Sequence, residues 1–181
     1  MEDIIKNILE TVSQKKVKSL CTKILKKFSF SSERDLKNIA DLATWLYIYE
    51  YYDEMLKVCD LLANMTFEDD YNIWAYPDLC MCLKSRVYKE KGLIKESQDI
   101  VKTINEHRHP ELYINVANEF EMMDFSISEE LKNRPESLAA ISRFGKLKFD
   151  ITYKEAGKFP VPDEVFEEDI KNLISILRQV K

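Results

Sequence analysis

Glycine and proline are scarce in this chain. Its 181 residues include only 3 Gly and 5 Pro, which is too few for the many turns of a multi-stranded sheet protein. The three glycines, at positions 92, 145 and 157, are isolated from one another. The sequence therefore lacks the Gly-rich loop that cradles a phosphate group. The shortage of turn-forming residues predicts a fold made of helices.

Long apolar runs are missing as well. No stretch approaches the roughly 18 uninterrupted apolar residues that a membrane-spanning helix needs. The first ten residues, MEDIIKNILE, carry acids where a signal peptide carries basic residues. We therefore expect a cytoplasmic protein without a membrane segment. The composition, with 45% hydrophobic and 33% charged residues, is typical of a globular protein, and we expect a single all-helical domain over residues 1–181.

Histidine occurs only twice, as His107 and His109 beside Glu106 and Glu111. A zinc ion held by both histidines and a carboxylate is chemically feasible, but Pro110 indicates that these residues lie at a helix boundary. A di-iron bundle would need a second Glu-x-x-His pair, and no nucleophile motif accompanies the histidines. We therefore expect structural or solvent-facing histidines, no cofactor and no enzymatic activity. A metal-dependent enzyme using His107 and His109 is kept as an alternative.

The four cysteines lie in apolar helical patterns. Cys80 and Cys82 are two residues apart, so they form neither a CxxC redox pair nor half of a zinc knuckle. A free thiol in such a pattern behaves as a small hydrophobic group. We expect Cys21, Cys59, Cys80 and Cys82 to be packed and reduced.

Apolar residues recur at helical spacing between Asn38 and Met65, which predicts two helices folded back on each other. The first carries Leu42, Ala43, Leu46 and Tyr49, and the second carries Met55, Leu56, Cys59, Leu62 and Ala63. A similar pattern returns 42 residues later, with Tyr88, Gly92, Ile94, Glu96, Val101 and Ile104 at positions matching Leu46, Glu50, Tyr52, Glu54, Cys59 and Leu62. The sequence therefore predicts two related helical hairpins.

Helix ends can be placed at several points. The gap between Val12 and Val17 breaks the apolar stripe, so we expect two helices, or a kink near Ser13, in the first 28 residues. Ser32 with Asp35 is typical of a capping box that opens the next helix. That helix is expected to end near Tyr51. Further helices are expected over about 53–65, 71–91, 93–106 and 111–123.

Pro77, Gly92 and the segment 145–155 give further local predictions. Pro77 is expected in the first turn of its helix, and Gly92 is typical of a helix C-terminal cap. In 145–155, alternating apolar residues suggest a strand, but the same residues also fit one helix face. We interpret the segment as helix because a lone strand would leave its backbone groups without partners. A last helix is expected from Asp163, burying Phe166, Ile170, Leu173, Ile174 and Leu177.

The two hairpins resemble tetratricopeptide repeats over residues 36–110. In the first, the family's signature positions hold Leu42, Ala43, Leu46, Tyr52, Asp53, Glu54, Cys59 and Leu62; in the second, they hold Ser85, Tyr88, Gly92, Glu96 and Val101. The Ala that opens the family's second helix is replaced by Met55 and Ser97. The family period is about 34 residues, so the 42-residue spacing requires an inserted acidic loop.

The resemblance implies an all-α array of antiparallel helical hairpins, stacked as a short tetratricopeptide-like array or right-handed superhelical bundle. Residues 1–30 would form basic N-terminal helices, 32–107 two hairpins, and 110–181 C-terminal helices. The family binds partner proteins or peptides in a groove lined by the first helix of each pair. Transferred by position, that groove contains Lys37, Ala40, Thr44, Tyr47, Leu79, Cys82, Arg86 and Lys89. Of these, Lys37, Thr44, Tyr47, Arg86 and Lys89 are the candidate partner-binding residues, and the basic surface suits a segment with acidic groups.

Charge is unevenly distributed. Residues 1–30 hold seven lysines and three acids, a net charge of +4, so the remainder carries −9 of the total of −5. This basic segment lacks arginine and interleaved aromatic residues, so we interpret it as a solvated helix face rather than a nucleic-acid interface. Carboxylate pairs such as Glu167 and Glu168 are likewise interpreted as solvated.

Taken together, these patterns favour a non-enzymatic interaction module that binds a partner protein or peptide through a helical groove. A small cytoplasmic immunity or antitoxin-like protein that neutralises a toxin is an alternative from size and acidity alone. The partner's identity and the oligomeric state do not follow from the sequence.

Overall fold

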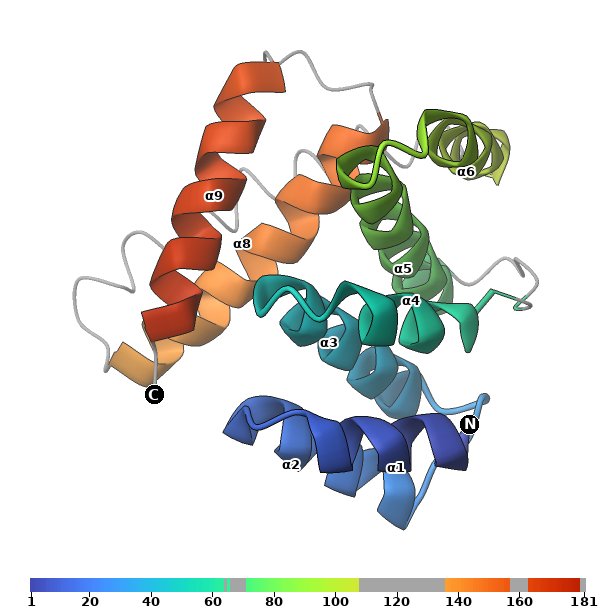
Figure 1. Ribbon diagram of the computed structural model, residues 1–181, viewed down its shortest axis with the longest axis vertical. Coiled ribbons are helices and arrows are strands. Elements are labelled where there is room, and N and C mark those ends of the chain that lie inside the picture. The colour runs from blue at the N-terminus through green and yellow to red at the C-terminus, as the bar shows by residue number, and fades with distance from the viewer. Residues whose placement is uncertain (64, 66–70, 108–135, 157–162, 180–181) are drawn as a thin grey trace.

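The computed structural model describes residues 1–63, 65, 71–107, 136–156 and 163–179, and every regular element in these ranges is an α-helix (Figure 1). The all-α prediction is confirmed. None of the described helices is long and apolar enough to cross a membrane. The expected helix over 111–123 lies outside the described residues. The helices are α1 (Glu2–Thr11), α2 (Lys15–Lys26), α3 (Glu33–Ile48), α4 (Tyr52–Asp60), α5 (Tyr71–Glu90), α6 (Ile94–His107), α8 (Glu136–Ala156) and α9 (Asp163–Gln179).

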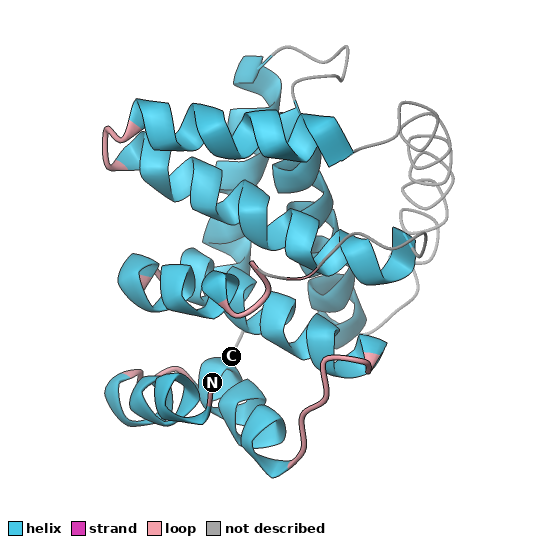
Figure 2. Cartoon of the chain, turned by 90° about the vertical axis from the view of Figure 1, so that its right-hand side faces the viewer, coloured by secondary structure: helices cyan, strands magenta, loops and turns pink. Residues whose placement is uncertain are grey.

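Consecutive helices pack as pairs, and the pairs lie in layers. α1 packs on α2, α3 on α4 and α5 on α6, while α2 also contacts α3 and α3 contacts α5. The views in Figures 1 and 2 place α1–α2 at the bottom, α3–α4 in the middle and α5–α6 above. The pair α8–α9 departs from this order, because α8 packs on α5 and α9 reaches back to α3. Residues near the C-terminus therefore lie against the middle of the stack.

The N-terminal helices begin and end close to the predicted positions. α1 ends at Thr11 and α2 begins at Lys15, which confirms the predicted break near Ser13. The Ser32 hydroxyl caps α3 by accepting a hydrogen bond from the Asp35 amide at 3.3 Å. In the usual capping box, the side chain three residues into the helix accepts from the amide of the capping residue, which here would be Ser32. The Asp35 carboxylate instead accepts from the Ser29 amide at 3.0 Å.

The turns that close the two hairpins share one geometry. The Tyr51 amide donates to the Leu46 carbonyl at 2.9 Å, and the Leu93 amide donates to the Tyr88 carbonyl at 2.8 Å. In each turn the preceding residue has a positive φ, 64° at Glu50 and 75° at Gly92. Both turns are thus Schellman caps, and their donors are 42 residues apart. The cap predicted at Gly92 is confirmed, and Glu50 adopts the same conformation without being a glycine.

Three sequence expectations can be compared directly with the helices. The segment 145–155 is helical, as we chose, within α8. The helix expected over 53–65 ends earlier, at Asp60. The expectation for Pro77 is wrong, because it is the seventh residue of α5 and lies beyond the first turn. The apolar residues that follow it, including Leu79 and Leu83, are buried, so tertiary packing outweighs the local cost of the proline.

One hydrophobic cluster joins all the layers. It runs from Ile5 and Ile8 of α1 through Leu42 and Leu46 of α3 to Leu177 of α9. All four cysteines are buried and free, which confirms the prediction of packed, reduced thiols. The predicted buried face of α9 is largely confirmed, since Phe166, Ile170, Leu173 and Leu177 are buried and Ile174 is partly buried.

Candidate functional site

Charged and aromatic side chains gather where α8 and α9 meet the central helices. Among the residues of α3 and α5 that contact the C-terminal pair, we call six together the docking face: Asp41, Trp45, Cys82, Ser85, Arg86 and Lys89. All except Lys89 are buried. The docking face therefore consists mainly of buried groups that meet an opposing helix.

Glu155 of α8 is seated on three donors of α5. Its carboxylate accepts hydrogen bonds from the Ser85 hydroxyl and the Lys89 ammonium, each at 2.8 Å, and lies 3.5 Å from the Arg86 guanidinium. The Glu155 side chain is only 1% exposed. A buried carboxylate costs free energy unless it is paired and hydrogen-bonded, and these three donors satisfy that condition.

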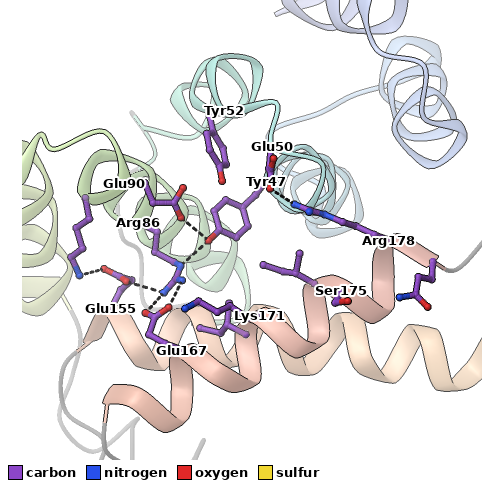
Figure 3. A pocket seen from close by; sticks show the side chains of 14 residues that line it. Tyr47, Glu50, Tyr52, Arg86, Glu90, Glu155, Glu167, Lys171, Ser175 and Arg178 are labelled. Atoms are coloured by element: carbon purple, nitrogen blue, oxygen red, sulfur yellow. Dashed lines mark hydrogen bonds and ion pairs between the residues drawn. The ribbon is translucent and has the colours of Figure 1, made fainter.

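Arg86 connects α5 to three other helices (Figure 3). Its Nε donates to the Tyr47 hydroxyl at 3.0 Å, and its two Nη atoms each donate to the Glu167 carboxylate of α9 at 2.9 Å. Burial lowers the Arg86 pKa, but the bonds to Glu167 and the contact with Tyr47 more than offset this, so the pKa lies above its ordinary value. The hydrogen bonds from Arg86 hold the pKa of Glu167 below its ordinary value. Both groups are therefore charged at neutral pH.

The other end of the docking face binds α8 through an aromatic stack and an ion pair. The Phe144 ring stacks on Trp45 with 4.7 Å between centroids and 10° between planes. The Lys148 ammonium donates to the Asp41 carboxylate at 2.7 Å. Phe144, Lys148 and Glu155 are spaced by four and seven residues along α8, so they lie on one helix face.

An open cavity of about 640 Å³ lies between α9 and the ends of α3, α4 and α5. Tyr47, Tyr52, Ile170 and Ile174 form part of its wall. At one end, Arg178 of α9 donates to the Ile48 carbonyl at 2.6 Å and to the Glu50 carboxylate at 2.7 Å. At the other end stands the Arg86–Glu167 pair. α9 is thus attached to the stack at two points, with the cavity between them (Figure 3).

The structure brings together three of the five candidate partner-binding residues. Tyr47 bonds to Arg86, and Arg86 and Lys89 both reach Glu155. Lys37 is exposed and pairs with Asp41 at the Lys148 end of the docking face. Thr44 is fully buried and its hydroxyl donates to the Ala40 carbonyl of its own helix at 2.8 Å, so this side chain is directed into α3. Of the wider groove set, Ala40, Leu79 and Cys82 are also buried.

Sequence reasoning missed the acidic half of the site. Glu167, interpreted as a solvated residue, is paired with Arg86, while its neighbour Glu168 is exposed as expected. The partners Arg86 and Glu155 are 69 residues apart in the chain, and Lys148 and Asp41 are 107 apart. The only sequence signal is that carboxylates interrupt the apolar faces of α8 and α9.

No cluster of three or more metal-ligating side chains occurs in the part of the chain that the structure describes. His109 and Glu111 lie outside the described residues. The metal-site alternative at His107 and His109 therefore stays a prediction.

The family comparison gives a classification without an activity. The model of a family of unknown function, DUF6707, matches residues 1–120, and the chain belongs to this family. No curated protein and no solved structure shows significant similarity to the chain. The matched part contains the whole docking face, whereas α8 and α9 lie beyond its end.

Proposed function

We propose that this member of the DUF6707 family is a non-enzymatic interaction module that holds a helical segment of a partner protein against α3 and α5. The observation that carries the proposal is the environment of Glu155, where a hydroxyl and two cationic groups of α5 converge on one carboxylate of an opposing helix. Such a cluster binds a carboxylate with defined geometry. The basic groups inferred for the groove thus meet a carboxylate of an opposing helix.

The arrangement of the hairpins supports the same proposal. α3 and α5 are the first helices of two pairs closed by equivalent caps at Glu50 and Gly92, which fits a tetratricopeptide-like array with an inserted loop. In that family the first helices line the binding groove. α3 and α5 lie side by side here, and together they carry the docking face.

Panning a library of helix-forming peptides against the full chain tests this proposal. We expect enrichment of amphipathic helices that carry Glu or Asp on the apolar face. Lys89→Glu should abolish their binding, since it reverses a charge that contacts Glu155 and is 46% exposed, so its loss is compatible with folding. Lys95→Glu on exposed α6 surface is the matched control. Enrichment of helices without an acidic residue on the apolar face, or equal binding to the Lys89→Glu variant, would contradict the proposal.

The two alternatives remain predictions with their own tests. A toxin gene directly upstream would favour the immunity-like alternative. Stoichiometric metal in the purified protein, together with a lower melting temperature in chelator, would favour the metal-dependent enzyme.

A further inference from the structure

We infer that α8 is an internal copy of the ligand that the docking face takes from a partner, and that a partner helix binds by displacing the pair α8–α9. The inference rests on the proposed function and adds the partner's chemistry. That partner is an amphipathic helix with an aromatic residue at position i, apolar residues at i+3 and i+7, and a carboxylate at i+11. These positions correspond to Phe144, Leu147, Ile151 and Glu155.

The contacts of α8 define this pattern. Phe144 stacks on Trp45 at one end, and Glu155 binds the three donors of α5 at the other. Between them, Leu147 and Ile151 are fully buried. The ends of the pattern are specific because an aromatic stack and a hydrogen-bonded carboxylate both depend on orientation, while the middle contributes apolar burial. A helix with the same four features can make the same contacts.

Buried charges make it costly to leave the docking face without a bound helix. Arg86 is 7% exposed and Asp41 is 8% exposed, and each has a counter-ion on the C-terminal pair. Removing one partner of a buried ion pair is strongly destabilising, whereas replacing it with an equivalent group keeps the pair satisfied. Release of α8–α9 is therefore costly alone and less costly when another helix brings a carboxylate to Arg86, while Asp41 keeps its pair with Lys37.

The attachment of α9 is suited to such release. α9 is held at its two ends by the Arg86–Glu167 and Arg178–Glu50 pairs, with the 640 Å³ cavity between them. The Arg178 pair is exposed and lies outside the docking face. Weakening the Arg178–Glu50 pair therefore loosens α8–α9 without changing the docking face itself.

The test measures binding of a labelled peptide with the sequence of residues 136–156 to the full chain by fluorescence anisotropy. A tethered occupant competes at high effective concentration, so we expect weak binding to the wild type. Binding to Arg178→Ala should be about tenfold tighter, since the free face is more populated. Asn172→Ala, at an exposed position of the same helix, should bind like the wild type. The same peptide with Glu155→Lys should bind none of these proteins.

Equal affinity for wild type and Arg178→Ala would overturn the inference while leaving the proposed function intact. No binding of the peptide to any form would also overturn it if the panned acidic helices still bind through Lys89. If those helices fail as well, the proposed function fails.

Hydrogen exchange of the wild-type protein provides a second measurement that needs no variant. We expect amides of α8 and α9 to exchange at least about tenfold faster than core amides of α3 and α5. Equal exchange across the four helices would mean that they open as one unit, and this result would overturn the inference.

Discussion

The pairs α3–α4 and α8–α9 both contribute apolar side chains to one core, but the second pair is also attached to the stack by buried ion pairs. α3 and α4 join through apolar side chains such as Leu42, Leu46 and Met55, all fully buried, and are close in sequence. α8–α9 is fixed to the stack by Glu155, Glu167 and other charged groups that meet partners more than 60 residues away. Apolar contacts tolerate many neighbours, whereas buried ion pairs require one geometry. The first pair therefore builds the scaffold, and the second makes a specific attachment.

Arg86→Ala should break the C-terminal attachment and have the largest effect. It leaves Glu155 buried without its guanidinium and Glu167 without its bidentate partner, which we expect to cost about 4 kcal/mol in the free energy of unfolding. Urea denaturation measures the loss, and hydrogen exchange should show the fastest new exchange in α8 and α9. Arg34→Ala on exposed surface is the control. A loss as small as that of the control would show that the network contributes little.

Leu46→Ala should weaken the scaffold instead. Leu46 is fully buried, and the cavity left by its side chain should cost about 3 kcal/mol in the free energy of unfolding. Because the central pair supports both neighbouring layers, exchange should rise across α2 to α5 rather than in α8 and α9 alone. Leu93→Ala, which removes a side chain from a residue that is 41% exposed, should change stability little. Faster hydrogen exchange in α8 and α9 alone would contradict the proposal that α3–α4 builds the scaffold.

Glu167→Gln should remove a pH-dependent part of the attachment. The pKa of Glu167 is below its ordinary value of 4.5 in the folded protein, chiefly through the hydrogen bonds from Arg86. Its contribution is therefore present above about pH 4.5 and is lost as the pH falls through the folded pKa. We expect a loss of about 1 kcal/mol at pH 7, reduced by partial solvent exposure. Melting curves between pH 3 and 7 should be flatter for the variant, while Glu168→Gln should keep the wild-type slope.

Gly92→Ala and Gly145→Ala should have small effects of opposite sign. An added Cβ meets nothing within 4 Å at either site, but Gly92 has a φ of +75°. Alanine at position 92 should therefore cost about 1 kcal/mol through backbone strain alone. Gly145 lies inside α8, so alanine there should stabilise the protein by about 0.5 kcal/mol. Thermal melting of the two variants measures the difference, and a gain at position 92 would contradict the role of the cap.

Local patterns were sufficient to predict most helices. The break near Ser13, the Ser32 cap, the Gly92 cap and the helical state of 145–155 all depend on residues a few positions apart. The position of Pro77 was predicted wrongly because burial of its helix outweighs a local penalty. The proposed groove residues Tyr47, Arg86 and Lys89 were found because they occupy repeat positions that can be aligned by spacing.

The sequence by itself determined that this protein is helical, where its hairpins turn, and which helix faces are apolar, because those properties follow from hydrogen bonds and side-chain spacing over short distances. Only the tertiary structure decided that Glu155 and Glu167 meet Arg86. Ion pairs between distant segments leave no periodic signal, since any of the chain's many acids could pair with any base until the packing of apolar faces brings two of them together.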